Sequence, residues 1–301
     1  MNPTSLAAIE TYLRDQRALV DQALEQFLPR AEEYPPAIHQ AMRYSVLAGG
    51  KRLRPILCLE TGRLFGGDEK SLVRLACALE LIHTYSLIHD DLPALDNDDL
   101  RRGKPTCHRA FGEATAILAG DALLTFAFET LSSPDPPLPA ERRLRVIREL
   151  THAIGTRGGM VGGQMIDLET TGQKTDATTL EFIHSAKTGA FFRAAVRSGA
   201  LYATAREDDL ERVTVYGGMV GLAFQIVDDL LDVLGSKEAL GKSVGKDGRQ
   251  RKATYPALHG VEQSRRIASR LVEEACKVLA PYGSRAEKLK GIAEFLLIRT
   301  T

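Results

Sequence analysis

A helical repeat of apolar residues runs along nearly the whole chain and restricts its fold more than any other feature. In KSLVRLACALELIHTYSLIH, residues 70–89, Leu72, Leu75 and Leu79 recur at spacings of three and four, which places them on one face of an α-helix. Similar patterns recur at residues 5–24, 114–131, 141–155, 179–205, 209–234 and 264–279. No stretch shows the alternation typical of a β-strand. The repeat predicts an all-α protein of about ten helices.

Length and composition favour a single domain over residues 1–301. Of the 301 residues, 44% are apolar, which is enough for a large hydrophobic core. The 39 basic and 39 acidic side chains balance, so the chain has no overall attraction for nucleic acid or an anionic membrane. No apolar run approaches the ~18 residues of a membrane span, and the N-terminus lacks a signal-peptide pattern. Four scattered cysteines favour reduced thiols, and we expect a cytoplasmic protein without membrane insertion.

Two acidic clusters each end an apolar helical stretch. The first, DDLPALDNDD, begins at Asp90, and the second, DDLLD, begins at Asp228. Like charges four residues apart, such as Asp228 and Asp232, destabilise a helix unless a counter-charge binds there. Pro93 interrupts the first helix, so Asp96 can fold back toward Asp90.

Carboxylates without close histidine or cysteine pairs suit a hard cation. Mg²⁺ takes one or two protein carboxylates and completes its shell with water and substrate phosphates. One such cluster alone is more often a helix cap or a solvated turn, but two of them favour Mg²⁺ ions that clamp a phosphorylated ligand. The expected metal ligands are Asp90, Asp91, Asp96, Asp228, Asp229 and Asp232.

Basic residues follow each acidic cluster and also follow a glycine pair. In GGKRLRP, Lys51 and Arg54 stand beside Gly50, a residue type that lets the backbone come close to a ligand. Arginine binds phosphate through a planar fork, and lysine acts as a point charge. A lone basic pair is usually a solvated surface, but this recurring pattern favours a diphosphate site. Its other members are Arg101, Arg102, Lys187 with Thr188, and Lys242.

Seven motifs occur in one order, namely GGKRLRP, LIHDDLPALDNDDLRRGKPTCH, GEATAILAGDALL, GGQMIDLETTG, KTGA, FQIVDDLLD and ATYPAL. In these motifs the chain resembles the trans-type short-chain prenyl diphosphate synthases, and most closely the bacterial farnesyl diphosphate synthases among them. The resemblance implies an all-α isoprenoid synthase helical bundle with a deep central cavity, usually a homodimer. It also implies head-to-tail condensation of isopentenyl diphosphate with dimethylallyl and geranyl diphosphate, which releases pyrophosphate.

The resemblance assigns the allylic substrate to the acidic clusters. Their six aspartates would hold about three Mg²⁺ ions on its diphosphate. The side chains of Arg101, Lys187 and Lys242 would contact the same diphosphate. Thr188 and Gln225 would face the carbon that ionises.

Isopentenyl diphosphate would bind, by the same resemblance, to Lys51, Arg54, His83 and Arg102 beside Gly50. Gln164 and Asp167 would lie one layer behind the reacting groups. Pyrophosphate leaves only when its charge is neutralised, and the allylic cation needs a dry, apolar pocket. This need explains the apolar stretch before the first acidic cluster. The departing pyrophosphate would itself accept the final proton.

Tyr85 lies five residues before Asp90, a rise of about 7.5 Å along a helix. In the family, an aromatic ring here, together with two extra residues at Pro93 and Ala94, is the bacterial farnesyl pattern, in which the ring is a floor that stops the product at C15. Ser86 beside it is small and adds no second barrier. The alternative is that Tyr85 only packs in the core and that the product is geranylgeranyl or geranyl diphosphate.

Two other classes of protein share part of this pattern. A class I terpene cyclase would carry an asparagine, serine and glutamate motif in place of DDLLD, and would have no use for Lys51 and Arg54. A regulatory subunit with this fold would have lost aspartates, but both clusters are intact. Phe191 and Phe192 depart from the aliphatic residues usual after KTGA, and a ring turned into the cavity would narrow it.

Overall fold

The computed structural model describes residues 3–134, 138–173, 175–234 and 254–298, in which helices joined by turns and loops, with one pair of short strands, make up the fold. The helices are α1 (Pro3–Phe27), α2 (Pro36–Val46), α3 (Leu53–Leu64), α4 (Glu69–Asp90), α5 (Cys107–Phe111), α6 (Glu113–Ser132), α7 (Ala140–Ile154), α8 (Met160–Thr170), α9 (Ala177–Ile183), α10 (Ala190–Tyr202), α11 (Glu207–Leu234), α14 (Tyr255–His259), α15 (Val261–Val278) and α16 (Glu287–Ile298). A π-helix, η1 (His184–Gly189), and a 3₁₀-helix, η2 (Ala280–Ala286), complete the helical elements. The antiparallel strands are β1 (Leu100–Arg101) and β2 (Lys104–Pro105). The predicted all-α class is confirmed.

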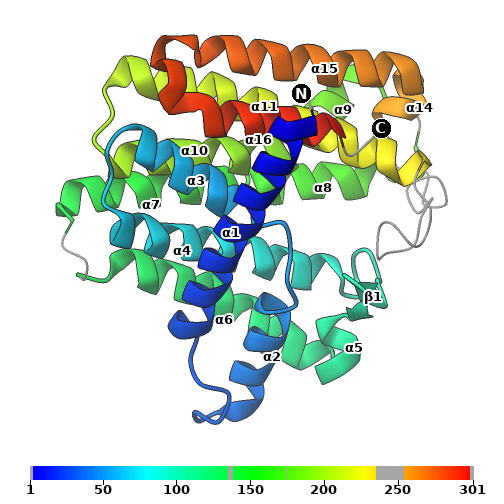
Figure 1. Ribbon diagram of the computed structural model, residues 1–301. Helices are drawn as coiled ribbons and strands as arrows, with labels where there is room; N and C mark the ends of the chain where they lie inside the picture. Colours follow the sequence, from blue (N-terminus) through cyan, green and yellow to red (C-terminus); the bar gives the residue numbers. More distant parts are fainter. Residues whose placement is uncertain (1–2, 135–137, 174, 235–253, 299–301) are drawn as a thin grey trace.

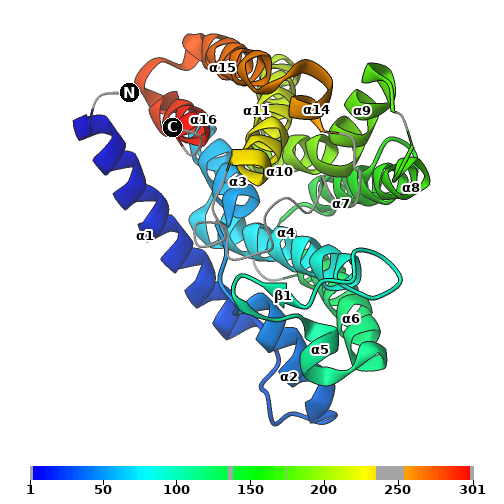
Figure 2. The ribbon, with the colours of Figure 1, turned by 90° about the vertical axis from the view of Figure 1, so that its right-hand side faces the viewer.

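Most helices run roughly parallel or antiparallel in a bundle that extends from α15 on one side to α6 on the other (Figure 1). α1 crosses the outside of this bundle at a steep angle, as the view turned by 90° also shows (Figure 2). Nearly all of the largest fully buried side chains, among them Ile56, Leu75, Phe192 and Tyr216, belong to α3, α4, α10 and α11. The core therefore lies among these four helices.

α4 forms because its sequence begins with a cap and continues without a helix breaker. The Asp68 carboxylate accepts a hydrogen bond from the backbone N–H of Ser71 at 2.9 Å, which satisfies one of the unpaired donors of the first turn. Leu72, Leu75 and Leu79, the predicted face, are fully buried. Burial of each leucine stabilises the fold by about 1.5–3 kcal/mol. The helix ends at Asp90 and so delivers the first acidic cluster to the edge of the core.

Glycines let the central helices approach one another closely. A Cβ atom at Gly199 in α10 would lie 2.2 Å from the carbonyl oxygen of Cys58 in α3. A Cβ atom at Gly221 in α11 would lie 2.9 Å from the Phe192 side chain in α10. Because close-packed interiors cannot absorb such overlaps, larger residues would push the helices apart. α10 thereby packs directly against the middle of α3 and against α11.

Two helices, α4 and α6, are long and apolar enough to cross a membrane by length and composition, which corrects the expectation that no stretch comes close to that length. In α4, 72% of the most apolar window is buried inside the bundle, against 39% in α6. The apolar character of α4 is that of a core helix. α6 instead leaves Ile117 and Leu118 exposed, so the described parts of the chain do not cover that side of it.

Candidate active site

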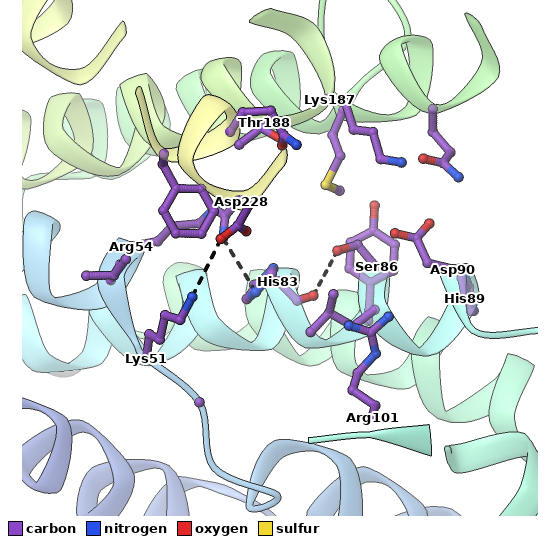
Figure 3. A pocket seen from close by; sticks show the side chains of 18 of the residues that line it. Lys51, Arg54, His83, Ser86, His89, Asp90, Arg101, Lys187, Thr188 and Asp228 are labelled. Carbon is purple, nitrogen blue, oxygen red and sulfur yellow. Dashed lines mark hydrogen bonds and ion pairs between the residues drawn. The ribbon is translucent and has the colours of Figure 1, made fainter. Parts of the chain in front are cut away.

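A cavity of about 1090 Å³ opens between α4, α8, η1, α11 and the segment that leads into α3. In Figure 3, Lys51, Asp228 and Lys187 approach it from different elements, and Asp90 stands at the end of α4. The predicted residues in its wall are Gly50, Lys51, Arg54, His83, Tyr85, Ser86, Asp90, Arg101, Arg102, Lys187, Thr188, Gln225, Asp228, Asp229 and Asp232. The predicted central cavity is therefore present. Asp91 and Asp96 stand outside this wall, and Lys242 lies outside the described residues.

The acidic loop after α4 turns back on itself, as Pro93 predicts. The backbone N–H of Asp96 donates to the carbonyl oxygen of Asp90 at 2.8 Å, and that of Asp98 donates to the carbonyl oxygen of Asp91 at 3.1 Å. These bonds hold the loop against the end of the helix. Asp98, which sequence reasoning did not select, lines the cavity together with Asp90.

Asp91 and Arg101 form a buried ion pair. The Arg101 Nε atom donates to both carboxylate oxygens at 2.9 and 2.8 Å, and its Nη2 atom donates to Oδ1 at 2.6 Å. Burial raises the pKa of Asp91, while Arg101 acts in the opposite direction. Since both oxygens already accept from Arg101, Asp91 determines where this guanidinium points. Its role as a metal ligand stays a prediction.

A tight hairpin carries Arg101 and Arg102 to the cavity. Its two turn residues, Arg102 and Gly103, have positive φ angles of 54° and 76°, as a two-residue type I′ turn requires. The Arg102 Nη1 atom donates to the carbonyl oxygen of Gly49. A Cβ atom at Gly50 would lie 2.7 Å from the Arg102 guanidinium. Gly50, whose φ angle is 145°, leaves room in this structure for the arginine.

A chain of hydrogen bonds links Thr188 to the second acidic cluster. The Thr188 hydroxyl donates to Gln225 Oε1 at 2.9 Å, and Gln225 Nε2 donates to Asp229 Oδ1 at 2.9 Å. The other oxygen of Asp229 accepts from the backbone N–H of Tyr255 at 3.0 Å. The ring of His184 stacks on Tyr255 with 5.3 Å between ring centres. The motif ATYPAL thus contributes a backbone donor that holds Asp229.

The π-helix η1 positions Lys187 and Thr188, and the apolar pattern did not predict it. Wide helical turns of this kind are frequent at functional sites. Gly163 in α8 permits the close approach, because a Cβ atom there would lie 2.4 Å from the backbone nitrogen of Lys187. The Lys187 Nζ atom donates to Asp167 Oδ2 at 2.7 Å. Burial lowers the pKa of Lys187, but Asp167 and Asp90 outweigh this effect and the net pKa is raised, so the amine is charged at neutral pH.

Arg54 and His83 contact each other on the opposite side of the cavity. The Arg54 Nη1 atom lies 3.4 Å from His83 Nε2. Burial lowers the pKa of Arg54 to about 10, and burial together with Arg54 lowers the pKa of His83 well below 6.5. At neutral pH, Arg54 is therefore charged, and it donates to a neutral imidazole.

Phe191 and Phe192 do not turn into the cavity. Both rings are fully buried, with their centres 5.3 and 4.6 Å from the guanidinium carbon of Arg54. Phe192 also contacts Phe224 at 5.1 Å between ring centres, and the Lys51 Nζ atom lies 5.3 Å from the Phe224 ring centre. The aromatic rings thus support the two cations predicted to bind isopentenyl diphosphate.

Sequence reasoning placed one residue of the site too far from the cavity and missed others. Gln164, expected one layer further out, lines the cavity itself, and both polar atoms of its amide are buried without a hydrogen-bond partner among the described residues. The signal available in the sequence was its position directly after two glycines, in the motif GGQ at residues 162–164. His89 and Glu80 also line the cavity. Nothing in the helical pattern separates them from ordinary residues of α4.

The acidic residues fit Mg²⁺ by their donor chemistry. Asp90 and Asp228 bring carboxylates from two helices to one cavity, and a cation, the Lys51 ammonium, already stands 3.7 Å from Asp228 Oδ1. Within the described parts of the chain, no three acidic, histidine or cysteine side chains converge closely enough to hold an ion alone. An ion here would take few protein carboxylates and complete its shell with water and phosphate oxygens, as Mg²⁺ prefers.

The bundle, with carboxylates and cations facing each other over a partly apolar cavity, defines the class of all-α isoprenoid synthases. The family model for polyprenyl synthetase matches residues 35–289. A dimethylallyltranstransferase of Fischerella ambigua is 52% identical over 96% of this chain and 83% of that protein. A geranylgeranyl diphosphate synthase of Cyanophora paradoxa is 50% identical over 96% of each. The crystal structure of an FPP/GFPP synthase from Zymomonas mobilis is 40% identical with a TM-score of 0.86, covering 97% of this chain and 99% of that one.

The chain therefore belongs to the polyprenyl synthetase family, as its motifs predicted. Within that family it is a short-chain prenyl diphosphate synthase. Such enzymes use isopentenyl and allylic diphosphates and generally depend on Mg²⁺.

Proposed function

We propose that the protein is a farnesyl diphosphate synthase, which adds isopentenyl diphosphate to dimethylallyl and then to geranyl diphosphate and stops at C15. The position of Tyr85 carries this proposal. Its side chain lines the cavity while remaining only 7% exposed. It precedes Asp90 by five residues on the same helix, about 7.5 Å along the axis. A ring at that depth limits the length of a hydrocarbon tail whose diphosphate is held near Asp90.

Geranylgeranyl diphosphate is the second candidate product, and the name of the Cyanophora paradoxa relative favours it. That product would require the tail to pass Tyr85, for example along α8, where Met165 and Leu168 line the same cavity. Geranyl diphosphate has less support. Ser86, which also lines the cavity, is too small to stop a shorter tail.

The allylic diphosphate would lie between the two acidic helices. We propose that Mg²⁺ held there neutralises the charge of the diphosphate as it leaves. Lys187 and Arg101, both positively charged, add donors to the same leaving group. Lys242 is proposed as a further cation on it. The proposed metal ligands are Asp90, Asp91, Asp96, Asp228, Asp229 and Asp232.

Isopentenyl diphosphate would occupy the basic side of the cavity. Lys51, Arg54 and Arg102 supply three positive charges at its wall. The neutral His83 would donate or accept a hydrogen bond without adding charge. Because Gly50 has no side chain, the diphosphate of isopentenyl diphosphate could come close to the backbone there.

The allylic cation would form beside uncharged oxygens. Thr188 and Gln225 hold each other through their hydrogen bond at 2.9 Å, so their dipoles keep a fixed position toward the reacting carbon. The cavity wall also contains Met160 and Leu231, which are apolar and exclude water that would capture the cation. The final proton would go to the departing pyrophosphate, because the charged Lys187 cannot accept it.

We further propose a cytoplasmic homodimer in which residues 1–301 form one domain. The exposed apolar residues Ile117 and Leu118 on α6 suit burial against a second copy. The four cysteines are free thiols, as expected in a reducing compartment. Two roles, nucleic-acid binding and membrane insertion, are not part of the proposal, because the charges balance overall and α4 is a core helix.

A product assay tests the proposal. Purified protein receives dimethylallyl diphosphate, excess isopentenyl diphosphate and Mg²⁺, and mass spectrometry gives the chain length. We expect mainly C15 from the wild type and from Tyr85→Phe, and longer products from Tyr85→Ala. Mainly C20 from the wild type would overturn the product length but keep the class of reaction. No condensation at all would overturn the proposed activity.

A further inference from the structure

Tyr85 is in contact with a second ring on its own helix. His89 follows it by one turn, so the two side chains share a face of α4. Their ring centres lie 5.7 Å apart with an angle of 84° between the planes, which is an edge-to-face contact. Both residues line the cavity, and Figure 3 shows His89 next to Asp90 at the end of the helix.

The imidazole of His89 is seated in a notch of α6. Its Nε2 atom lies 3.1 Å from the carbonyl oxygen of Ile117, so Nε2 carries the hydrogen and donates it. Asp121 Oδ1 lies 3.8 Å from the same nitrogen. A Cβ atom at Gly120 would lie 2.2 Å from Nε2. The notch therefore exists only because residue 120 has no side chain.

His89 therefore connects the backbone of α6 with the Tyr85 ring in the cavity wall. The backbone at Ile117 and Gly120 fixes the imidazole on one side. The edge-to-face contact fixes the Tyr85 ring on the other side. We propose that His89 is a positioning residue for product length, which holds the Tyr85 ring across the cavity by resting on Gly120.

This inference rests on the proposed function, since it assumes that Tyr85 is the floor of the C15 pocket. Without the imidazole, a space opens beside the Tyr85 ring on the side toward Asp90. The ring can then turn into that space and let the tail pass. Loss of an edge-to-face contact changes the ratio between the two positions of the Tyr85 ring, across the cavity and turned aside, by roughly three- to tenfold. We expect the fraction of products longer than C15 to rise by about that factor.

The experiment compares product lengths at saturating isopentenyl diphosphate and low conversion. His89→Ala removes the ring, and His89→Gln keeps an amide donor for Ile117 but has no ring. Gly120→Ala closes the notch and displaces the imidazole. His89→Phe is the matched control, because it keeps an aromatic ring beside Tyr85. Since His89 adjoins Asp90, total turnover is recorded separately from the ratio of C20 to C15.

The double variant Tyr85→Ala/His89→Ala shows whether His89 acts through Tyr85. We expect His89→Ala, His89→Gln and Gly120→Ala to lengthen the product, and the double variant to match Tyr85→Ala alone. If Tyr85→Ala lengthens the product but His89→Ala only slows turnover, the inference is wrong and the proposed function stands. If Tyr85→Ala leaves the product unchanged, the floor lies elsewhere, and both the C15 argument and this inference fall. A double variant with products longer than those of Tyr85→Ala would give His89 an independent role and overturn the inference.

Discussion

Replacement of Glu80 by glutamine should lower both the stability of the protein and its affinity for isopentenyl diphosphate. Glu80 Oε1 accepts from Arg52 Nη1, and neither side chain is more than 1% exposed. Burial works against the charge of Arg52, but Glu80 and Asp21 outweigh it and raise its pKa. Arg52 has a positive φ of 51° and stands between Lys51 and Arg54. The buried pair therefore anchors the segment that carries both cations.

The expected loss of stability depends on the hydrogen bonds that the Arg52 guanidinium retains after the substitution. Removal of one partner from a buried ion pair costs about 3–5 kcal/mol. Arg52 retains hydrogen bonds to Asp21 Oδ1 at 2.8 Å and to the carbonyl oxygen of Val46 at 2.6 Å, and glutamine still offers an oxygen. We therefore take the lower end, about 3 kcal/mol. With an unfolding entropy of about 2.1 cal/mol/K per residue, this loss corresponds to a fall in Tm of about 5 °C.

Asp21→Asn is the matched control, because it alters another partner of the same guanidinium. Its side chain is 38% exposed, so the change should cost only about 0.5–1 kcal/mol. Thermal unfolding and the KM for isopentenyl diphosphate are measured for both variants and for the wild type. We expect Glu80→Gln to have the larger fall in Tm and the larger rise in KM, with kcat less affected. A fall in Tm no greater than that of Asp21→Asn would refute the argument.

Three further predictions follow from the site. Burial and neighbouring guanidinium groups lower the pKa of His83 in the folded protein well below 6.5. At pH values between this pKa and that of the unfolded chain, only the unfolded chain carries a protonated His83. Stability should therefore fall with pH below 6.5 by about 1.4 kcal/mol per unit, and His83→Gln should make urea unfolding less dependent on pH between 6.5 and 5. Asp228→Asn should abolish turnover at every Mg²⁺ concentration while circular dichroism stays unchanged; normal turnover would exclude Asp228 from the metal site. Phe192→Leu removes the ring beneath Arg54, which is worth about 0.5–2 kcal/mol, and should raise the KM for isopentenyl diphosphate but leave that for the allylic substrate unchanged.

The main features of the fold were predictable because they depend on local sequence. The apolar repeat of α4, its end at Asp90 and the return of the loop after Pro93 all follow from helix periodicity and from the chemistry of proline. The π-helix at Lys187 was not predictable, because one extra residue per turn changes the apolar pattern too little to notice. The notch at Gly120 was missed for a different reason. It exists only through contact between α4 and α6, which no local pattern records.

Adjacent aspartates in the two clusters have different surroundings, and sequence alone could not separate them. A helix turns by about 100° per residue, so the second aspartate of each pair points away from the first. Asp91 is turned toward Arg101, and Asp229 toward Gln225 Nε2 and the backbone N–H of Tyr255. Asp90, Asp228 and Asp229 all line the cavity, whereas Asp91 does not, and Asp228 Oδ1 lies 3.7 Å from the Lys51 ammonium. In both clusters, therefore, protein donors fix the carboxylate of the second aspartate, and in the first cluster this aspartate also lies outside the cavity wall.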